Sequence, residues 1–327
     1  MKQAIIPKKP EATAVDAFRP IGLQNCSIKI IAKALTRRLQ KEIGKLIDLN
    51  QSGFLKGRSI SETFVFAAEL VQTCKKRKLP ALVLKLDFAK VFDTVNWVGL
   101  DLVLQAQGFS VKWRNWIQSI LSSSRSAVLV NGCPGPWISC KQGLRQGDPL
   151  SPYLFLLVAD TLQALIKKYA QEIKHPIDSS AHCAMLQYAD DMPIVTKGEL
   201  RGVQKLKEVL DLFCGSNGTD NQLQQNTVVP IHLDENLLQQ CIGVPGCRQE
   251  SFPQNYLSLP LSSTKLPASA FSTYIDRTDK FLSSWQAKLL NTMGRVVFIN
   301  SILDSQLVYV MSSMQVPPMV IQQIDKR

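Results

Sequence analysis

A short segment with two adjacent aspartates constrains this chain more than any other stretch. An apolar run, Ala184 to Leu186, leads into Tyr188, and Asp190 and Asp191 separate it from a second apolar run that begins at Met192. Two β-like runs around a polar pair are typical of a hairpin, so both carboxylates are expected at its tip. Adjacent carboxylates repel each other and add no packing. They form either an ordinary solvated turn or a site for a divalent metal ion, which prefers hard oxygen ligands.

A metal site of this kind requires a further carboxylate, and the stretch from Ala81 to Phe88 offers one. Its leucines alternate with Val83, Lys85 and Asp87. This period of two predicts a β-strand with one apolar face. Asp87 comes at the end of that strand and outside its apolar face, where a sheet can present a ligand.

Composition and charge narrow the class of protein. The chain has 327 residues, which is room for about two domains, and its 45% hydrophobic and 20% charged content is globular rather than disordered. The net charge is +12, and residues 1–199 hold 27 Lys and Arg against 16 Asp and Glu. An excess of this kind indicates a polyanionic partner, most commonly nucleic acid, and a merely soluble basic surface is the alternative.

The cysteine spacing and the short apolar runs argue against a zinc-binding, a secreted or a membrane-spanning protein. No C-x-x-C pair or Cys/His spacing of the zinc type occurs, which indicates free thiols in a reducing compartment. The N-terminus does not have the pattern of a signal peptide, and no apolar run approaches the roughly 20 residues of a membrane span. No membrane contact is therefore expected.

Helices and strands are predicted in mixed order, without regular βα alternation, which favours an α+β fold. Ser27 is the predicted N-cap of a basic helix, and Ser59 with Glu62 predicts a capping box. Further helices are predicted over 94–107, from Ser110, and after a glycine loop over 143–152. Asn131-Gly132 predicts a hairpin turn.

The order of these features resembles the reverse transcriptases of LINE-type (non-LTR) retroelements, especially the plant lineage. The resemblance covers essentially the whole chain. The segments that carry it are Phe18–Ile21, Asn50–Phe54, Leu84–Phe88, Gly143–Pro152, Tyr188–Asp191 and Tyr256–Leu261, with Trp285 and Met293–Arg295 continuing it.

The resemblance implies a right-hand polymerase fold with fingers, palm and thumb, in which an antiparallel palm sheet packs on helices. Residues 1–262 would form the fingers (about 1–80 and 98–140) and the palm (about 81–97 and 141–262). Residues 263–327 would form an incomplete, helical thumb-like region.

The family chemistry implies roles for the three aspartates. Asp87, Asp190 and Asp191 would be the catalytic residues and would hold two Mg²⁺ ions, with Mn²⁺ as an alternative, for attack of a primer 3′-hydroxyl on a nucleotide. Without metal, three crowded carboxylates would repel each other strongly. The implied partners are an RNA template, a DNA primer and deoxynucleoside triphosphates, and no partner protein is expected.

Other roles are carried over by position. Phe92 would screen the nucleotide 2′-position, with core packing as the alternative, and Gln146 and Gly147 would line the nucleotide pocket. The candidates for the triphosphate are Arg19 and Lys29, and those for the template and primer are Lys56, Arg58, Tyr188 and Tyr256.

Three departures from the family pattern lower the polymerase activity that we expect from this chain. Val91 replaces a usual alanine, Pro193 falls inside the second strand of the hairpin, and Gln225 stands where the family has a lysine. The sequence therefore predicts a weakly active or inactive fragment of a decaying element, truncated at both ends. The rival hypotheses are a nucleic-acid-binding remnant without turnover and a chain that does not fold stably. Family resemblance implies an intracellular location in the nucleus.

Overall fold

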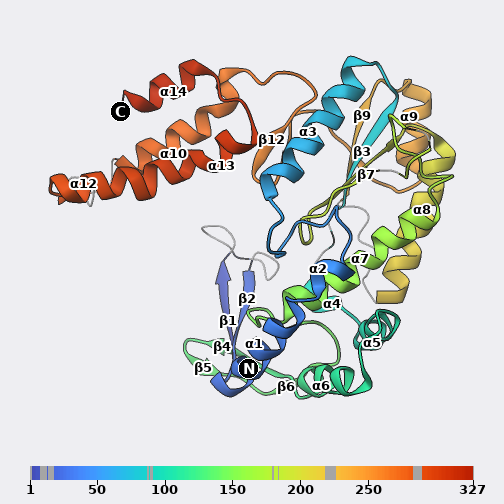
Figure 1. Ribbon diagram of the computed structural model, residues 1–327, viewed down its shortest axis with the longest axis vertical. Coiled ribbons are helices and arrows are strands. Elements are labelled where there is room, and N and C mark those ends of the chain that lie inside the picture. Colours follow the sequence, from blue (N-terminus) through green and yellow to red (C-terminus); the bar gives the residue numbers. More distant parts are fainter. Residues whose placement is uncertain are drawn as a thin grey trace. The chain divides into compact units, whose positions relative to one another are not determined.

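The computed structural model describes residues 2–7, 13, 18–86, 88, 91–178, 180–182, 184–217, 226–282 and 289–326. The chain forms two compact units (Figure 1). The first comprises residues 1–58 and 80–249, and the second comprises residues 59–79 and 250–327. The structure does not test the predicted division into fingers, palm and thumb, which stays a prediction.

A five-stranded sheet in the order β10-β9-β3-β8-β7 is the centre of the first unit. All neighbours are antiparallel except β10 and β9. The strands are β3 (Ala81–Leu86), β7 (Ala184–Met185), β8 (Met192–Lys197), β9 (Thr227–Ile231) and β10 (Arg248–Gln249). The pairing of β3 with β8 runs from Ala81 opposite Lys197 to Leu86 opposite Met192.

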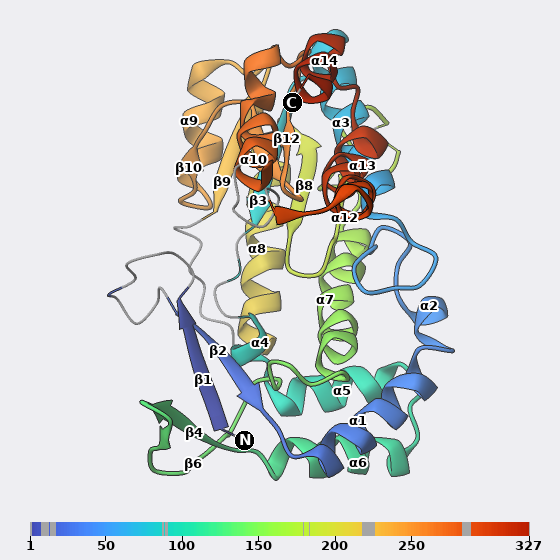
Figure 2. The ribbon, with the colours of Figure 1, turned by 90° about the vertical axis from the view of Figure 1, so that its left-hand side faces the viewer.

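The predicted alternation of β3 is confirmed. Leu82, Leu84 and Leu86 join one buried core with residues from helices α7 and α8, which run alongside the sheet (Figure 2). The helices of the first unit are α1 (Cys26–Leu39), α2 (Ile43–Leu46), α4 (Val91–Thr94), α5 (Trp97–Ala106), α6 (Val111–Ser122), α7 (Ser151–Lys168), α8 (Leu200–Asn217) and α9 (Glu235–Gly243).

A second sheet in this unit contains the predicted Asn131-Gly132 hairpin. Both turn residues have positive φ, 50° and 80°, as a two-residue hairpin turn requires. The strands are β1 (Lys2–Pro7), β2 (Phe18–Leu23), β4 (Arg125–Val130), β5 (Cys133–Pro134) and β6 (Ile138–Ser139).

Helix starts differ from the predictions in two places. The first helix begins at Cys26 with Asn25 at the N-cap, so Ser27 lies inside its first turn. The helix predicted over 94–107 begins later, at Trp97, because Asn96 caps α5 by accepting hydrogen bonds from the N–H groups of Val98 and Gly99, and Thr94 is the last residue of the separate helix α4. Asparagine favours caps over helix interiors because its side chain competes for backbone N–H groups.

The second unit packs helix α3 (Ile60–Lys76) against a short hairpin of β11 (Gln254–Tyr256) and β12 (Leu259–Leu261). The Phe64 and Tyr256 rings stack with centroids 6.3 Å apart. Ser59 occupies the N-cap but makes no side-chain capping bond, so the predicted capping box is wrong. The remaining elements are η3 (Ala268–Phe271), α10 (Ser272–Leu282), α12 (Thr292–Phe298), η4 (Ile299–Leu303), α13 (Asp304–Ser313) and α14 (Pro318–Asp325).

One helical stretch, Thr292–Ser313, is long and apolar enough by length and composition alone to cross a membrane, with a mean hydropathy of 1.3 over its best window. The sequence prediction, based on unbroken apolar runs, did not single it out, because Arg295 and Asn300 interrupt the stretch. Such a helix is weak evidence for a membrane span.

Candidate active site

The Tyr188–Asp191 segment forms a tight turn between β7 and β8. The Tyr188 N–H donates to the Asp191 carbonyl at 3.0 Å, and the Asp191 N–H donates back to the Tyr188 carbonyl at 3.1 Å. The two central residues are therefore Ala189 and Asp190, whereas the sequence placed both aspartates at the tip. Asp190 is exposed and Asp191, which closes the turn, is half-buried.

The strand that precedes the third predicted ligand reaches this turn. Leu86 pairs with Met192, the residue directly after Asp191. Asp87 itself lies outside the described residues, so its convergence with Asp190 and Asp191 stays a prediction. Among the described residues, no group of three or more Asp, Glu, His or Cys side chains forms a metal site.

Pro193 lies in β8, an inner strand of the sheet, although proline in a sheet is usually confined to an edge strand. The Leu186 N–H donates to the Pro193 carbonyl at 3.0 Å. In an antiparallel ladder, the nitrogen and carbonyl of one residue point to the same neighbour. The missing Pro193 donor therefore faces Leu186, one residue beyond the end of β7, and no bond between β3 and β8 is lost.

The loop of residues 50–53 is joined to the turn by backbone bonds. Gln51 and Gln187 form a parallel bridge. The Gln187 N–H donates to the Asn50 carbonyl at 3.0 Å, and the Ser52 N–H donates to the Gln187 carbonyl at 2.9 Å. A segment more than 130 residues earlier in the chain is thus an added strand-like partner of the turn.

The side chain of Gln51 reaches the turn itself. Its Oε1 accepts from the N–H of Gly53 at 2.8 Å and from the N–H of Ala189 at 3.1 Å. Two N–H donors on one atom fix the orientation of the carboxamide, because its NH₂ group cannot accept. In the sequence this segment is recognisable only as a family signature, and the spacing of residues along the chain does not show the contact, because its partners are 138 positions apart.

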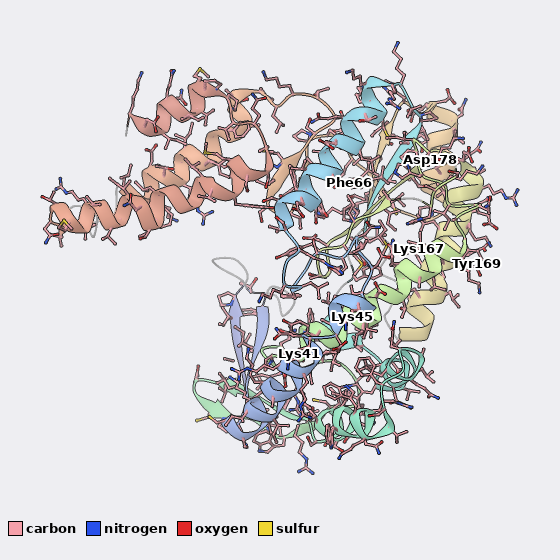
Figure 3. The ribbon with its side chains drawn as sticks, viewed as in Figure 1. Lys41, Lys45, Phe66, Lys167, Tyr169 and Asp178 are labelled. Carbon is pink, nitrogen blue, oxygen red and sulfur yellow. The ribbon has the colours of Figure 1, made fainter. Side chains whose placement is uncertain are left out.

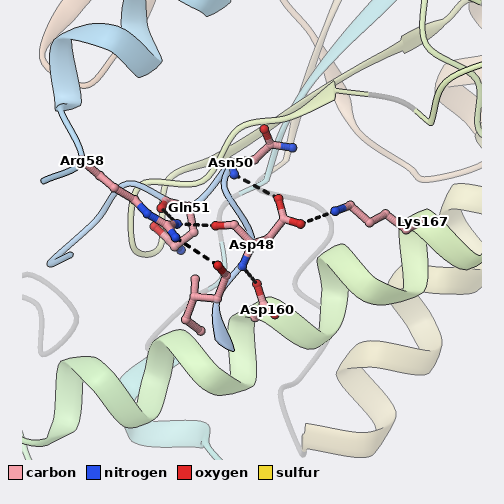
Figure 4. Close-up of polar contacts among 7 residues, drawn as sticks. Asp48, Asn50, Gln51, Arg58, Asp160 and Lys167 are labelled. Carbon is pink, nitrogen blue, oxygen red and sulfur yellow. Dashed lines mark hydrogen bonds and ion pairs between the residues drawn. The ribbon is translucent and has the colours of Figure 1, made fainter. Parts of the chain in front are cut away.

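A network of hydrogen bonds and one ion pair anchors the loop of residues 50–53 to the surrounding structure (Figure 4). The Arg58 guanidinium donates to four backbone carbonyls, those of Gly44, Ile47, Asp48 and Gln51. With these bonds, Arg58 fixes the loop, and its predicted template contact stays a prediction.

Asp48 connects this loop to helix α7. Its N–H donates to Asp160 Oδ1 at 2.9 Å, and its carboxylate forms an ion pair with Lys167. Burial raises the pKa of Asp160. Burial alone would raise the pKa of Asp48 as well, but its hydrogen bonds with Lys167 and with the Asn50 N–H outweigh that effect and lower it.

The residues predicted for the nucleotide pocket lie on α4 and on the glycine loop. The half-buried Phe92 ring packs on Phe155 at a centroid distance of 4.9 Å. Gln146 Nε2 donates to both carboxylate oxygens of Asp93, at 3.1 and 3.3 Å, and Gly147 has φ of +87°. The structure shows core contact for Phe92, and its screening role stays a prediction.

The glycine loop fits tightly against α4. A Cβ on Gly143 would lie 2.6 Å from the Asp93 carbonyl oxygen. Buried charges within the loop hold it further: Arg145 Nε donates to Ser124 Oγ at 2.7 Å, and the Asp148 carboxylate accepts from the Leu150 N–H at 2.8 Å. Burial raises the pKa of Asp148 and lowers that of Arg145.

The remaining predicted contacts lie on both units. Lys29 and Lys56 are exposed and Tyr188 is half-buried. Arg19 is in β2, opposite Ile6, and its side chain lies outside the described residues. Tyr256 belongs to the second unit and is only 2% exposed, so its predicted primer contact stays a prediction. Two further lysines follow α1 in the chain: Lys41 lies just beyond its end, and Lys45 lies in α2 (Figure 3). The sequence did not mark either as a ligand.

A mostly antiparallel sheet that carries an Asp-Asp turn, with a second strand ending beside it and helices packed against it, is the arrangement of an α+β polymerase fold. The chain belongs to the reverse transcriptase (RNA-dependent DNA polymerase) family, which matches residues 6–220. Reverse transcriptases generally use divalent metal ions.

The curated relatives include proteins of non-LTR retrotransposons. The chain is 26% identical over 316 residues to a transposon TX1 uncharacterized 149 kDa protein of Xenopus laevis, covering 94% of this chain and 23% of the relative. It is 24% identical over 196 residues to a Pol polyprotein of a type-1 retrotransposable element R2 of Nasonia vitripennis, covering 60% and 18%. An uncharacterized mitochondrial protein of Arabidopsis thaliana is 37% identical over 67 residues, covering 19% and 55%. The chain thus spans a quarter or less of the two retrotransposon proteins.

Solved structures show the same fold. A telomerase of Candida albicans in complex with a TWJ fragment of telomeric RNA matches with a TM-score of 0.56 at 11% identity, covering 99% of this chain and 61% of that one. A telomerase of Candida tropicalis with the same kind of RNA fragment matches with a TM-score of 0.55 at 12% identity, covering 99% and 54%. The predicted α+β polymerase fold is confirmed.

Proposed function

We propose that this chain is the RNA-directed DNA polymerase domain of a non-LTR retroelement. It would extend a DNA primer on an RNA template by transferring nucleotides from deoxynucleoside triphosphates to the primer 3′-hydroxyl. The observation that carries the proposal is the exposed Asp190 on a turn that Gln51 holds through a hydrogen bond to Ala189. Leu86 of β3 pairs with Met192, next to this turn, and Asp87 directly follows Leu86 in the sequence.

The residues present fit a divalent metal ion. Asp190 offers hard oxygen atoms, and its carboxylate has no hydrogen bond or ion pair within the described part of the chain. Together with Asp191 and Asp87, it would hold two Mg²⁺ ions, or Mn²⁺, as predicted from the sequence. When bound, such ions activate the attacking hydroxyl and stabilise the leaving oxygen.

The chain's own residues bind and orient the substrates. The bonds of Gln51 and the loop 50–53 fix the turn, and the Gln146–Asp93 contact fixes the glycine loop beside α4. Exposed Lys29 and Lys56 would contact phosphates, where basic side chains position a nucleic acid without reading its sequence. Phe92, held on Phe155, would face the nucleotide sugar.

Origin and location belong to the same proposal. Plant-lineage ancestry is supported by the 37% identity to the Arabidopsis protein, although only over 67 residues. A nuclear location follows from the family resemblance alone, and imaging of a tagged full-length chain would test it.

Primer extension on a homopolymeric RNA template with Mg²⁺ tests the function. We expect slow but measurable extension, abolished by Asp190→Asn, while binding of primer-template persists. Wild-type extension that survives in Asp190→Asn would assign the activity to another site or to a contaminant. Binding without any extension in the wild type would leave the rival, a nucleic-acid-binding remnant.

A further inference from the structure

Ala189 holds an unusual backbone conformation at the centre of the turn. Its φ is 56°, in the left-handed region where an alanine is uncommon and glycine is the usual residue. The residue that follows it is Asp190, the exposed carboxylate of the proposed metal site. The direction of the Asp190 side chain therefore depends on a backbone conformation that alanine does not favour by itself.

Gln51 is the side chain that holds this conformation. Its Oε1 accepts the Ala189 N–H at 3.1 Å while it also accepts the Gly53 N–H at 2.8 Å, and Gln51 is fully buried. Buried hydrogen bonds are shielded from competing water. The Gln51 backbone is fixed in turn by its bridge to Gln187 and by the bond from Arg58 to its carbonyl.

We propose that Gln51 is a positioning residue for the metal-binding aspartates: it keeps Ala189 left-handed and thereby aims the Asp190 carboxylate. The proposal rests on the proposed function for its catalytic meaning, but the clamp itself is a property of the folded chain. Only the acceptor oxygen of Gln51 takes part, because its Nε2 has no partner among the described residues.

Gln163 on α7 provides a matched control. It is also buried, only 1% exposed, and neither atom of its carboxamide has a hydrogen-bond partner within the described residues. Replacing an unpartnered buried amide with an apolar side chain of similar size is close to neutral. Gln163→Met therefore removes a buried carboxamide from the same unit without touching the turn.

Amide exchange of Ala189 measures the clamp directly. The full chain is labelled with [¹⁵N]alanine, and the Ala189 signal is assigned by its disappearance in Ala189→Gly. We expect the wild-type Ala189 amide to be protected although it lies at a turn. Gln51→Met should speed its exchange about tenfold, the effect of losing one buried hydrogen bond, and Gln163→Met should leave it unchanged.

Binding of Mn²⁺ links the clamp to the aspartates. Electron paramagnetic resonance counts free Mn²⁺, and we expect Gln51→Met to weaken binding several-fold while Gln163→Met does not. Because glycine adopts positive φ without strain, Ala189→Gly in the Gln51→Met background should restore part of the Mn²⁺ affinity. A merely structural role for Gln51 would give no such rescue.

The outcomes separate the two proposals. An unprotected Ala189 amide in the wild type, or equal effects of Gln51→Met and Gln163→Met, would overturn the clamp. The wild-type measurement decides this even if Gln51→Met does not fold. Wild-type protein that protects Ala189 but neither binds Mn²⁺ nor extends primers would retain the clamp and reject the proposed function.

Discussion

A Cβ atom on Gly53 would lie 2.6 Å from the backbone nitrogen of Ala189. Real Cβ atoms do not approach backbone this closely, so the loop of residues 50–53 lies against the turn only because position 53 is glycine. The same N–H group that the Cβ would meet donates to Gln51 Oε1 at 3.1 Å. Any side chain at position 53 therefore pushes on the bond that holds the turn.

Gly53→Ala should consequently destabilise the fold by about 1–3 kcal/mol, as overpacking does, and should slow extension further by moving the turn. Gly44→Ala is the matched control, because a Cβ there meets no atom within 4 Å and the residue lies in helix α2. Alanine favours a helix over glycine by up to about 1 kcal/mol. Thermal unfolding compares the two, and equal losses of stability would contradict the steric argument.

The buried carboxylates behind the loop predict opposite pH responses. The pKa of Asp160 is raised by burial, so the folded state binds its proton more tightly than the unfolded chain. The charged form therefore costs stability, and this cost appears as pH rises above the ordinary value for aspartate near 3.9. Asp160→Asn should match or exceed wild-type stability at pH 7, because the asparagine oxygen still accepts the Asp48 N–H.

For Asp48 the sign reverses. Burial opposes its ionisation, but the Lys167 ion pair and the Asn50 N–H lower its pKa. Its contribution is present above the unfolded pKa and is lost as pH falls through the folded one. Asp48→Asn should therefore destabilise the protein at pH 7, and the difference should shrink as pH falls below the ordinary aspartate value near 3.9. Urea unfolding between pH 3 and 7, a range that brackets the unperturbed carboxyl pKa values, checks both variants. Plots of unfolding free energy against pH that run parallel for the wild type and both variants would refute the opposite pKa shifts of Asp160 and Asp48.

Pro193 shows where sequence reasoning and structure differ on function. The sequence alone predicts that Pro193→Leu increases extension, because proline removes a ladder donor. In the structure that donor faces Leu186, beyond the end of β7. We therefore expect Pro193→Leu to change the extension rate less than threefold when compared at equal amounts of folded protein. A large gain would show that the ladder beside the turn is incomplete because of the proline.

Local patterns were enough for much of the fold. The alternation of Leu82, Leu84 and Leu86, the Asn131-Gly132 turn and the Tyr188 hairpin were each predicted, because strand period and turn chemistry are written in neighbouring residues. The bonds from Gln51 to Ala189 and from Asp48 to Asp160 were not, since they join residues 138 and 112 positions apart. No local period encodes such pairs. The Ser27 cap was wrong because Asn25, two residues earlier, is an equally good cap.

The basic face of helix α1 gives the last prediction. Lys33 and Arg37, four residues apart on α1, and Lys41, just beyond its end, are exposed and make no ion pair within the described residues. If they bind the phosphates of a single-stranded template, replacing all three with glutamine should weaken binding and reduce the slope of log K against log salt by about 2, given about 0.7 per contact.

Three cations at the end of α3 provide the matched control. Lys76, Arg77 and Lys78 are equally exposed, and their replacement removes the same charge from the second unit. Lys78 takes asparagine rather than glutamine, because its φ is 53° and asparagine tolerates that conformation better. Fluorescence anisotropy with a labelled RNA between about 50 and 200 mM salt compares the two triple variants. Equal reductions in slope would show that net charge, rather than the α1 face, sets the affinity, because only a local contact distinguishes two variants of the same charge.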